Sequence, residues 1–317
     1  MTAQVVENFL QALFAGLTVG AIYGLMCVGL ALIFGVMRVI NFAQGEFMML
    51  GMYAAFYIFT VFGVQTVLGS IIGPYVAALL AGPVLACTGY VVHKALIGRV
   101  SGTRTQIEGE GHYAQLILTL GISLIVQSVG LIAFGSILVS VRTPLSSSAW
   151  ELGPLWGDLV SVFINKSRGI AAVISIATIM ALAVLISRSR LGKSLRAAAD
   201  NPEAATYMGI DVDRAHGIAF ALGVGVTAIA GGLLATNYPF HPYVGLEYVI
   251  IMYAGVVLGG LGSIIGPFWG GMTIGLVQQL STLVLPTQLQ NTAIFVVFLL
   301  IVFFMPQGFF GRVVERT

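Results

Sequence analysis

The sequence predicts an all-α fold, a polytopic transmembrane helix bundle of eight or nine spanning segments. Hydrophobic residues make up 58% of the chain and charged residues only 8%, whereas soluble domains carry about a quarter charged residues. The mean hydropathy is +1.00. Stretches without an ionisable residue recur at the length of about 20 residues that crosses a bilayer. We therefore expect residues 1–317 to form a single transmembrane domain in contact with membrane lipid.

The apolar stretches divide the chain into segments that are separated by turn residues or by charges. The first has no basic residue before it and is too long for the core of a signal peptide, so we expect it to stay in the mature protein. The expected spans are Leu10–Val36, Phe47–Leu68, Ile71–Val92, Leu116–Val139, Ile170–Ile186, Ile218–Tyr238, Tyr248–Leu261, Ile264–Leu285 and Thr292–Met305.

Glycines recur at four-residue spacing in the first span, at Gly16, Gly20 and Gly24, and again at Gly266 and Gly270. This spacing places hydrogen atoms along one helix face and lets a second backbone approach closely. We expect tight helix packing at both places, which bears on the fold and not on chemistry.

Basic residues predict the orientation of the chain, because cytoplasmic loops are enriched in Lys and Arg. They cluster in three regions: Lys94, Arg99 and Arg104; Arg188, Arg190, Lys193, Arg196 and Arg214; and Arg312 and Arg316. With nine spans, the N-terminus then lies outside and the C-terminus in the cytoplasm. The loop of residues 140–169, which carries Arg142, Lys166 and Arg168, also lies outside. The net charge of +2 gives no indication of nucleic-acid binding.

Residues that could support an enzyme or a metal site are few and scattered. The two cysteines, Cys27 and Cys87, each lie in an apolar run, so neither a disulfide framework nor a cysteine-rich metal site is expected. The four histidines are not spaced as metal ligands. We expect no catalytic residues, no metal and no cofactor bound by this chain.

Two apolar stretches are interrupted by polar or helix-breaking residues, Arg38–Glu46 and Asn237–Glu247. Neither can form a continuous lipid-facing helix, and paired interruptions in the two halves of a transporter are the best sequence indication of its solute pathway. The alternative is that both are loops at the membrane surface. Arg38 and Glu46 could also form an ion pair. The candidate pathway residues are Asn41, Gln44, Glu46 and Glu247.

A short capped helix is predicted inside the charged region 187–214. Asn201 can cap it, Pro202 suits the first helical position, and Gly209 can end it in a left-handed conformation. A helix of residues 202–208 is too short to be stable alone, so it must pack either on its own membrane domain or on a partner. The residues assigned to such a docking helix are Asn201, Pro202, Glu203, Ala204, Ala205, Met208 and Gly209, with Ala204 and Ala205 expected at the contact.

The chain resembles the membrane subunits of the branched-chain amino acid ABC importers, a family that includes urea and short-chain amide permeases. The resemblance rests on residues 35–46, on residues 190–211, on Leu258-Gly-Gly-Leu-Gly-Ser-Ile-Ile-Gly-Pro267 and on Met305-Pro-Gln-Gly308. It implies a permease subunit of a bacterial cytoplasmic (inner) membrane importer. The implied partners are a second homologous permease, two cytoplasmic ATPase subunits that use the ATP, and an extracytoplasmic solute-binding protein. The short helix would then be the coupling helix.

The resemblance leaves the solute open. Gln44 stands where the family often has His, and a Lys associated with amino acid members is missing near Ile251, although Glu247 is present. Branched-chain amino acids, urea, an amide and an organic acid all fit. The alternative function is a secondary ion-coupled transporter, in which a buried acidic residue, Glu46 or Glu247, would couple ion and solute movement.

Overall fold

The apolar segments become helices in a computed structural model that describes residues 2–100, 111–141, 143–155, 160–260, 265–305 and 307–310. The charges Arg104, Arg142, Arg312 and Arg316 and the middle of the Leu258–Pro267 motif lie outside these residues. The helices formed by the predicted spans are α1 (Thr2–Met37), α2 (Gln44–Thr60), α3 (Val64–Val92), α5 (Gly111–Phe134), α6 (Lys166–Arg188), α9 (Val212–Ala235), α10 (Val244–Gly259), α11 (Ile265–Ser281) and α12 (Gln290–Phe304).

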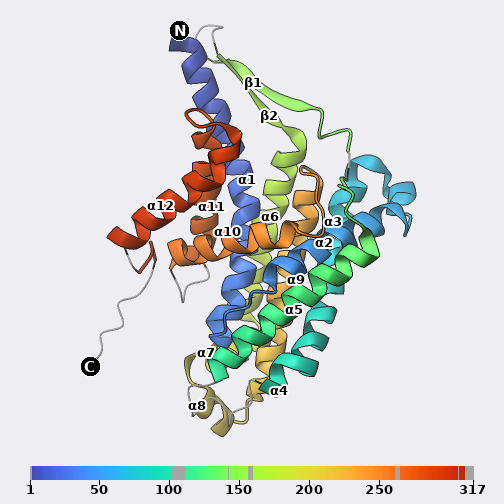
Figure 1. Ribbon diagram of the computed structural model, residues 1–317, viewed down its shortest axis with the longest axis vertical. Helices are drawn as coiled ribbons and strands as arrows, with labels where there is room; N and C mark the ends of the chain where they lie inside the picture. The colour runs from blue at the N-terminus through green and yellow to red at the C-terminus, as the bar shows by residue number, and fades with distance from the viewer. Residues whose placement is uncertain are drawn as a thin grey trace.

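Five helices in the described part of the chain are long and apolar enough to cross a membrane, which confirms the all-α membrane bundle. They are α1, α5, α6, α9 and the continuous helix of residues 64–100 that begins with α3. The others are shorter, and α10, at 16 residues, would reach only about 24 Å. Figure 1 shows α10 crossing the direction of α1 instead of running along it. The expected number of eight or nine spans stays a prediction.

The boundary between the second and third predicted spans was wrong. Helix α2 ends at Thr60, and α3 begins at Val64 after Gly63, whose φ is +75°. The predicted break between Leu68 and Ile71 is a kink inside α3 at Gly69, where φ is +71°. Both glycines adopt a left-handed backbone that an L side chain disfavours. Hydropathy alone did not separate the two, because residues on both sides of each turn are apolar.

The core of the bundle lies around α1, α2 and α9, whose side chains are mostly buried. Helix α3 packs on α2 and α9, α11 packs along α1, and α10 packs against both α2 and α11. Helix α5 instead leaves large apolar side chains uncovered, including Ile117, Ile125 and Ile132 at 68%, 64% and 85% exposure. In a bilayer such a surface faces lipid tails.

The α1–α11 contact confirms that the first glycine repeat serves close packing. A Cβ at Gly20 would lie 2.8 Å from the carbonyl oxygen of Met272, and one at Gly16 would lie 2.9 Å from the Cα of Leu276. In the second repeat, Gly270 lies against the backbone of Gly255 on α10. The two repeats therefore bring α1, α11 and α10 into direct backbone contact.

The two ends of the bundle carry different structures, as Figure 1 shows. At the end with the N-terminus, the chain forms an antiparallel hairpin, β1 (Ala149–Leu155) and β2 (Val160–Asn165), which the all-α prediction did not include. Gln11 of α1 fixes β2 by donating to the carbonyl of Phe163 at 2.6 Å and accepting from its N–H at 3.0 Å.

The opposite end carries α4 (Gly98–Val100), α7 (Arg190–Asp200) and α8 (Pro202–Tyr207), with the π-helix η1 (His93–Ile97) joining α3 to α4. A 3₁₀ turn, η3 (Thr287–Leu289), precedes α12. Helix α7 was not predicted. Its N-cap is Ser189, whose hydroxyl accepts from the Gly192 N–H, and the helix buries Leu195 and Ala198 against the bundle.

We predict that Gly20→Leu lowers the thermal stability of the purified protein, whereas Gly35→Leu on the same helix does not. A side chain at Gly20 would overlap the α11 backbone, and overpacking of this kind costs about 1–3 kcal/mol or more. Gly35 has no atom within 4 Å of an added Cβ. Melting curves in detergent measure the difference, and equal melting temperatures for both variants would contradict a structural role for the α1–α11 contact.

Candidate functional site

The two interrupted segments, far apart in sequence, meet inside the bundle. The first interruption runs from Arg38, whose φ is +55°, to the start of α2 at Gln44. The second ends where α10 begins at Val244. Gly45 and Gly245 lie so close that a Cβ on Gly45 would overlap the carbonyl of Gly245. The beginnings of α2 and α10 are therefore in backbone contact, as the pairing of interrupted helices in transporters leads one to expect.

Side chains of the first interruption tie the turn to α9. The Asn41 amide donates to the Gln44 side-chain oxygen at 2.9 Å, and its own oxygen accepts from the Ala43 N–H at 3.2 Å. The Gln44 amide nitrogen donates to Thr227 Oγ1 at 2.6 Å and to the Gly223 carbonyl at 3.2 Å. Asn41 and Gln44 are 1% and 0% exposed. Their polar atoms are satisfied within the chain, so both side chains hold the interruption in place.

Glu46 has an oxygen without a partner. Its Oε1 accepts from Ser123 Oγ of α5 at 3.4 Å, whereas Oε2 is buried and has no hydrogen-bond partner. The residue is 2% exposed, and a Cβ on Gly245 would lie 2.8 Å from its carboxyl group. Unpaired carboxyl groups at this depth are costly and are usually functional. Arg38 does not pair with Glu46 in the structure, and its guanidinium donates instead to the carbonyl of Ala199 at 3.3 Å.

The second interruption is held from the other side by an isolated β-bridge. Phe240 and Val139 exchange both backbone hydrogen bonds, at 2.9 and 2.8 Å. Tyr53 of α2 stacks on Phe134 at 3.9 Å between centroids and packs edge-on against Phe240 at 4.9 Å. These contacts hold Phe240, and with it the segment that leads into α10, in place.

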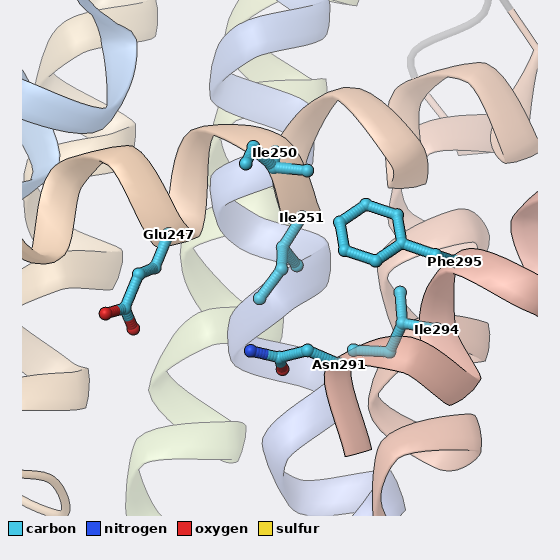
Figure 2. A pocket seen from close by; sticks show the side chains of 6 residues that line it. All are labelled: Glu247, Ile250, Ile251, Asn291, Ile294 and Phe295. Atoms are coloured by element: carbon cyan, nitrogen blue, oxygen red, sulfur yellow. The ribbon is translucent and has the colours of Figure 1, made fainter. Parts of the chain in front are cut away.

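Glu247 lies apart from the other three candidate residues and borders a hollow of about 120 Å³ between α10 and α12. Figure 2 shows its side chain projecting from α10 at the left of the view, apart from Asn291 of α12, which lies nearer the centre below Ile251. Apolar side chains form the rest of the lining: Ile250, Ile251, Ile294 and Phe295. Glu247 is exposed on this chain, so its carboxylate stands at the edge of an apolar surface. Of the sequence-predicted pathway residues, Glu247 borders this hollow, and Asn41, Gln44 and Glu46 do not.

Sequence reasoning missed Asn291 and Ser123. Each is a polar residue in or beside an apolar segment, which is the pattern that could have identified it. The sequence did not show which residues would be their neighbours. Ser123 donates to Glu46, 77 residues away, and Asn291 lines the same hollow as Glu247 because α12 packs on α10.

The short helix α8 begins at the predicted residue and has the predicted capping residues. The Asn201 side chain accepts from the Ala204 N–H at 3.0 Å, Pro202 is the first helical residue, and Gly209 has a φ of +81°. Glu203 lies in the first turn, where its charge complements the helix dipole. The helix ends at Tyr207, one residue earlier than predicted, with Met208 as its C-terminal cap.

The assignment of Ala205 to an outward contact was wrong. Ala205 is 5% exposed and belongs to the same core cluster as Val212 and Ala215 of α9, because α8 folds back onto that helix. Ala204 is exposed, and Tyr207 and Met208 are 88% and 82% exposed. The outward surface of α8 is therefore formed by Tyr207, Met208 and Ala204. Which residues of α8 face inward depends on how the helix packs on α9, and the local sequence does not specify that packing.

Comparisons with known proteins show which family this sequence matches. The family described as branched-chain amino acid transport system / permease component matches residues 12–305. The permease LivH of the high-affinity branched-chain amino acid transport system of Escherichia coli K12 is 29% identical over 96% of both chains. The corresponding protein BraD of Pseudomonas aeruginosa is 28% identical over 97% of both.

A probable branched-chain amino acid transport permease, LivH of Methanocaldococcus jannaschii, is 28% identical over 81% of this chain and 76% of its own. No solved structure matches the chain. The relatives are named as transport components, and none of these names describes an enzyme. The match over residues 12–305 and over nearly the whole length of the relatives shows that this chain belongs to the family of branched-chain amino acid transport system permease components.

Proposed function

We propose that this chain is the permease subunit of an ATP-driven importer and forms part of the translocation pathway for branched-chain amino acids. The observation that carries the proposal is the likeness, over 96% of the chain, to a protein named as a permease of the high-affinity branched-chain amino acid transport system. Its partners are a second permease subunit, two cytoplasmic ATPases that bind the ATP, and an extracytoplasmic solute-binding protein. The chain itself binds no cofactor.

The distribution of charge supports an orientation in the bacterial cytoplasmic membrane. Exposed Arg188, Arg190, Lys193 and Arg196 lie in or beside α7, at the end that also carries α8. We place this end in the cytoplasm, since basic loops stay on that side. The hairpin and the N-terminus then face outside, where a solute-binding protein docks, and the C-terminus lies in the cytoplasm.

The solute pathway of the proposal runs along the face of α10 and α12. A carboxylate exposed among apolar side chains is unfavourable against lipid tails, so this face requires water or a second subunit. Glu247 can attract the ammonium group of an amino acid, Asn291 can accept or donate a hydrogen bond, and Ile250 and Phe295 offer apolar contact to a branched side chain. Glu46, with its unpartnered oxygen, lies deeper, at the meeting of the two interruptions.

The complex should take up leucine only with ATP and all subunits present. We expect liposomes that contain this chain, its companion permease and the two ATPases to accumulate radiolabelled leucine when the solute-binding protein is outside and ATP is inside. Omission of the ATPases should abolish uptake, because the energy enters through them. Uptake driven by a proton or sodium gradient without ATPases would contradict the proposal and favour a secondary transporter.

Glu247→Gln should reduce leucine uptake about tenfold or more, because removal of one charge partner of the ammonium group costs on the order of 1.4 kcal/mol. The matched control is Glu151→Gln, the same change at an exposed site on the hairpin. Co-purification of the ATPases should be normal in both variants. Normal uptake by Glu247→Gln would remove this residue from the pathway.

The leucine uptake assay also tests the buried residues Glu46 and Gln44, for which the expected results differ. Glu46→Gln keeps the size of the side chain and should lower uptake if the buried carboxyl takes part in the pathway. Gln44→Leu leaves the Gly223 carbonyl and Thr227 without their partner, so it should lower the folded yield as well as uptake. Normal uptake by the Glu46 variant would limit that residue to a structural role.

The double variant Tyr207→Ala and Met208→Ala should weaken coupling to the ATPases. Their exposed side chains form the outward surface of α8, and loss of two contact side chains of this kind costs about 2 kcal/mol or more, roughly 30-fold in affinity. Solute-stimulated ATP hydrolysis and co-elution of the ATPases measure the effect. Leu191→Ala, at a 48% exposed site on α7, is the matched control. Full hydrolysis and co-elution in the double variant would make α8 merely structural.

A further inference from the structure

A second hollow, of about 440 Å³, lies at the same end of the molecule as α8 and has no part in the proposed transport function. It lies where the last turns of α3, the π-helix η1 and α4 face the beginning of α9. Three basic side chains border it, Lys94, Arg99 and Arg214, together with the acidic residues Asp211 and Asp213.

The wall of this hollow contains a buried histidine, one of whose ring nitrogens has no hydrogen-bond partner. His93 is 4% exposed, and its Nε2 has no hydrogen-bond partner. Its Nδ1 faces the lining glycines: a Cβ on Gly217 would lie 3.2 Å from it, and one on Gly98 would lie 3.7 Å away. Buried polar nitrogens normally have a partner, so an imidazole in the wall of a hollow indicates a ligand there.

The helix that carries His93 is also irregular at this point. Residues His93–Ile97 form a π-helix, and its first two residues, His93 and Lys94, both border the hollow. Single π-helical turns are rare and occur frequently at functional sites. Phe220 of α9 packs against the imidazole, with 5.8 Å between ring centroids. The irregular turn therefore places His93 and Lys94 together at the wall of the hollow.

In the part of the chain that the structure describes, the basic side chains around the hollow outnumber the acidic ones by three to two, and none of them is paired directly. Among the described residues, Lys94, Arg99 and Arg214 form no ion pair within 4.0 Å. The Asp211 carboxylate instead caps α9 by accepting from the Arg214 N–H at 3.0 Å. Lys and Arg side chains that surround a cavity without partners suit a phosphate group, which Arg can bind with two parallel hydrogen bonds.

The helical segment that borders this hollow also carries exposed apolar side chains. On the last turns of α3 and on η1, Val91 and Leu96 are 63% and 44% exposed, and Tyr90, at 37%, borders the hollow itself. Acyl chains can lie against such a surface while a headgroup enters the hollow. Basic pockets between helices at the cytoplasmic side of a membrane bind phosphorylated lipid headgroups.

We propose that the hollow between α3, η1 and α9 is a binding site for a phosphate group, supplied by the headgroup of an anionic phospholipid. Lys94, Arg99 and Arg214 neutralise the phosphate, and His93 hydrogen-bonds one of its oxygens. The site is independent of the transported solute. Its place in the cytoplasmic leaflet rests on the orientation proposed above.

The test measures binding of dioctanoyl phosphatidylglycerol, inorganic phosphate and dioctanoylglycerol to the purified full-length chain in a non-ionic detergent. Wild-type protein should bind the phospholipid, and dioctanoylglycerol, which lacks the phosphate, should bind at least about tenfold more weakly. The double variant Lys94→Gln and Arg214→Gln should lose about tenfold or more in phospholipid affinity. The double variant Arg190→Gln and Lys193→Gln removes the same charge from exposed sites on α7 and should bind normally.

His93→Phe tests the imidazole without removing charge or ring volume. It should weaken phospholipid binding while the melting temperature of the lipid-free protein stays within a few degrees of wild type. Binding of inorganic phosphate alone, with the same dependence on Lys94 and Arg214, would retain the phosphate site and overturn the lipid as its source. Equal phospholipid affinities in wild type and in both double variants would overturn the site itself.

Discussion

Contact between glycine backbones is the interaction on which this structure depends. Helices in a membrane gain little from the hydrophobic effect, so close packing and short polar contacts must hold them together. Glycines of α1 lie against the α11 backbone, Gly270 lies against Gly255, and Gly45 lies against Gly245. The last of these contacts brings the two interrupted segments together. Backbone groups freed at these interruptions must be satisfied within the protein, because each unsatisfied group in lipid costs several kcal/mol.

The polar residues near this contact divide into two kinds. Asn41 and Gln44 satisfy each other and the α9 backbone, which makes them part of the scaffold. Glu46 retains an unpartnered oxygen, and Glu247 projects from α10 at a hollow on the surface. Residues that satisfy one another stabilise a conformation, whereas residues with free acceptors remain available to water, a solute or another subunit. The proposed pathway therefore depends on the two glutamates more than on the two amides.

The end of the bundle that carries α8 presents two different surfaces that could each bind a partner. Helix α8 buries Ala205 on α9 and leaves Tyr207 and Met208 uncovered, so one short element both anchors itself and offers a surface. Close to it, the π-helical turn at His93 leaves a basic hollow beside apolar side chains. A partner protein can use the first of these surfaces and a lipid headgroup the second, because the first presents exposed side chains and the second a cavity lined by charge.

Local rules of the sequence determined the helical class, the positions of most helices, the capped ends of α8 and the two interruptions, since each of these depends on composition or on neighbouring residues. They did not determine the hairpin, helix α7 or the end of α2 at Thr60, where apolar residues continue through the turn. Contacts between distant residues decided the rest. Three features follow only from the way the helices pack: α9 satisfies the Gln44 amide, Ala205 faces inward, and Asn291 lines the same hollow as Glu247. Each of them joins an element to another that its own sequence does not specify.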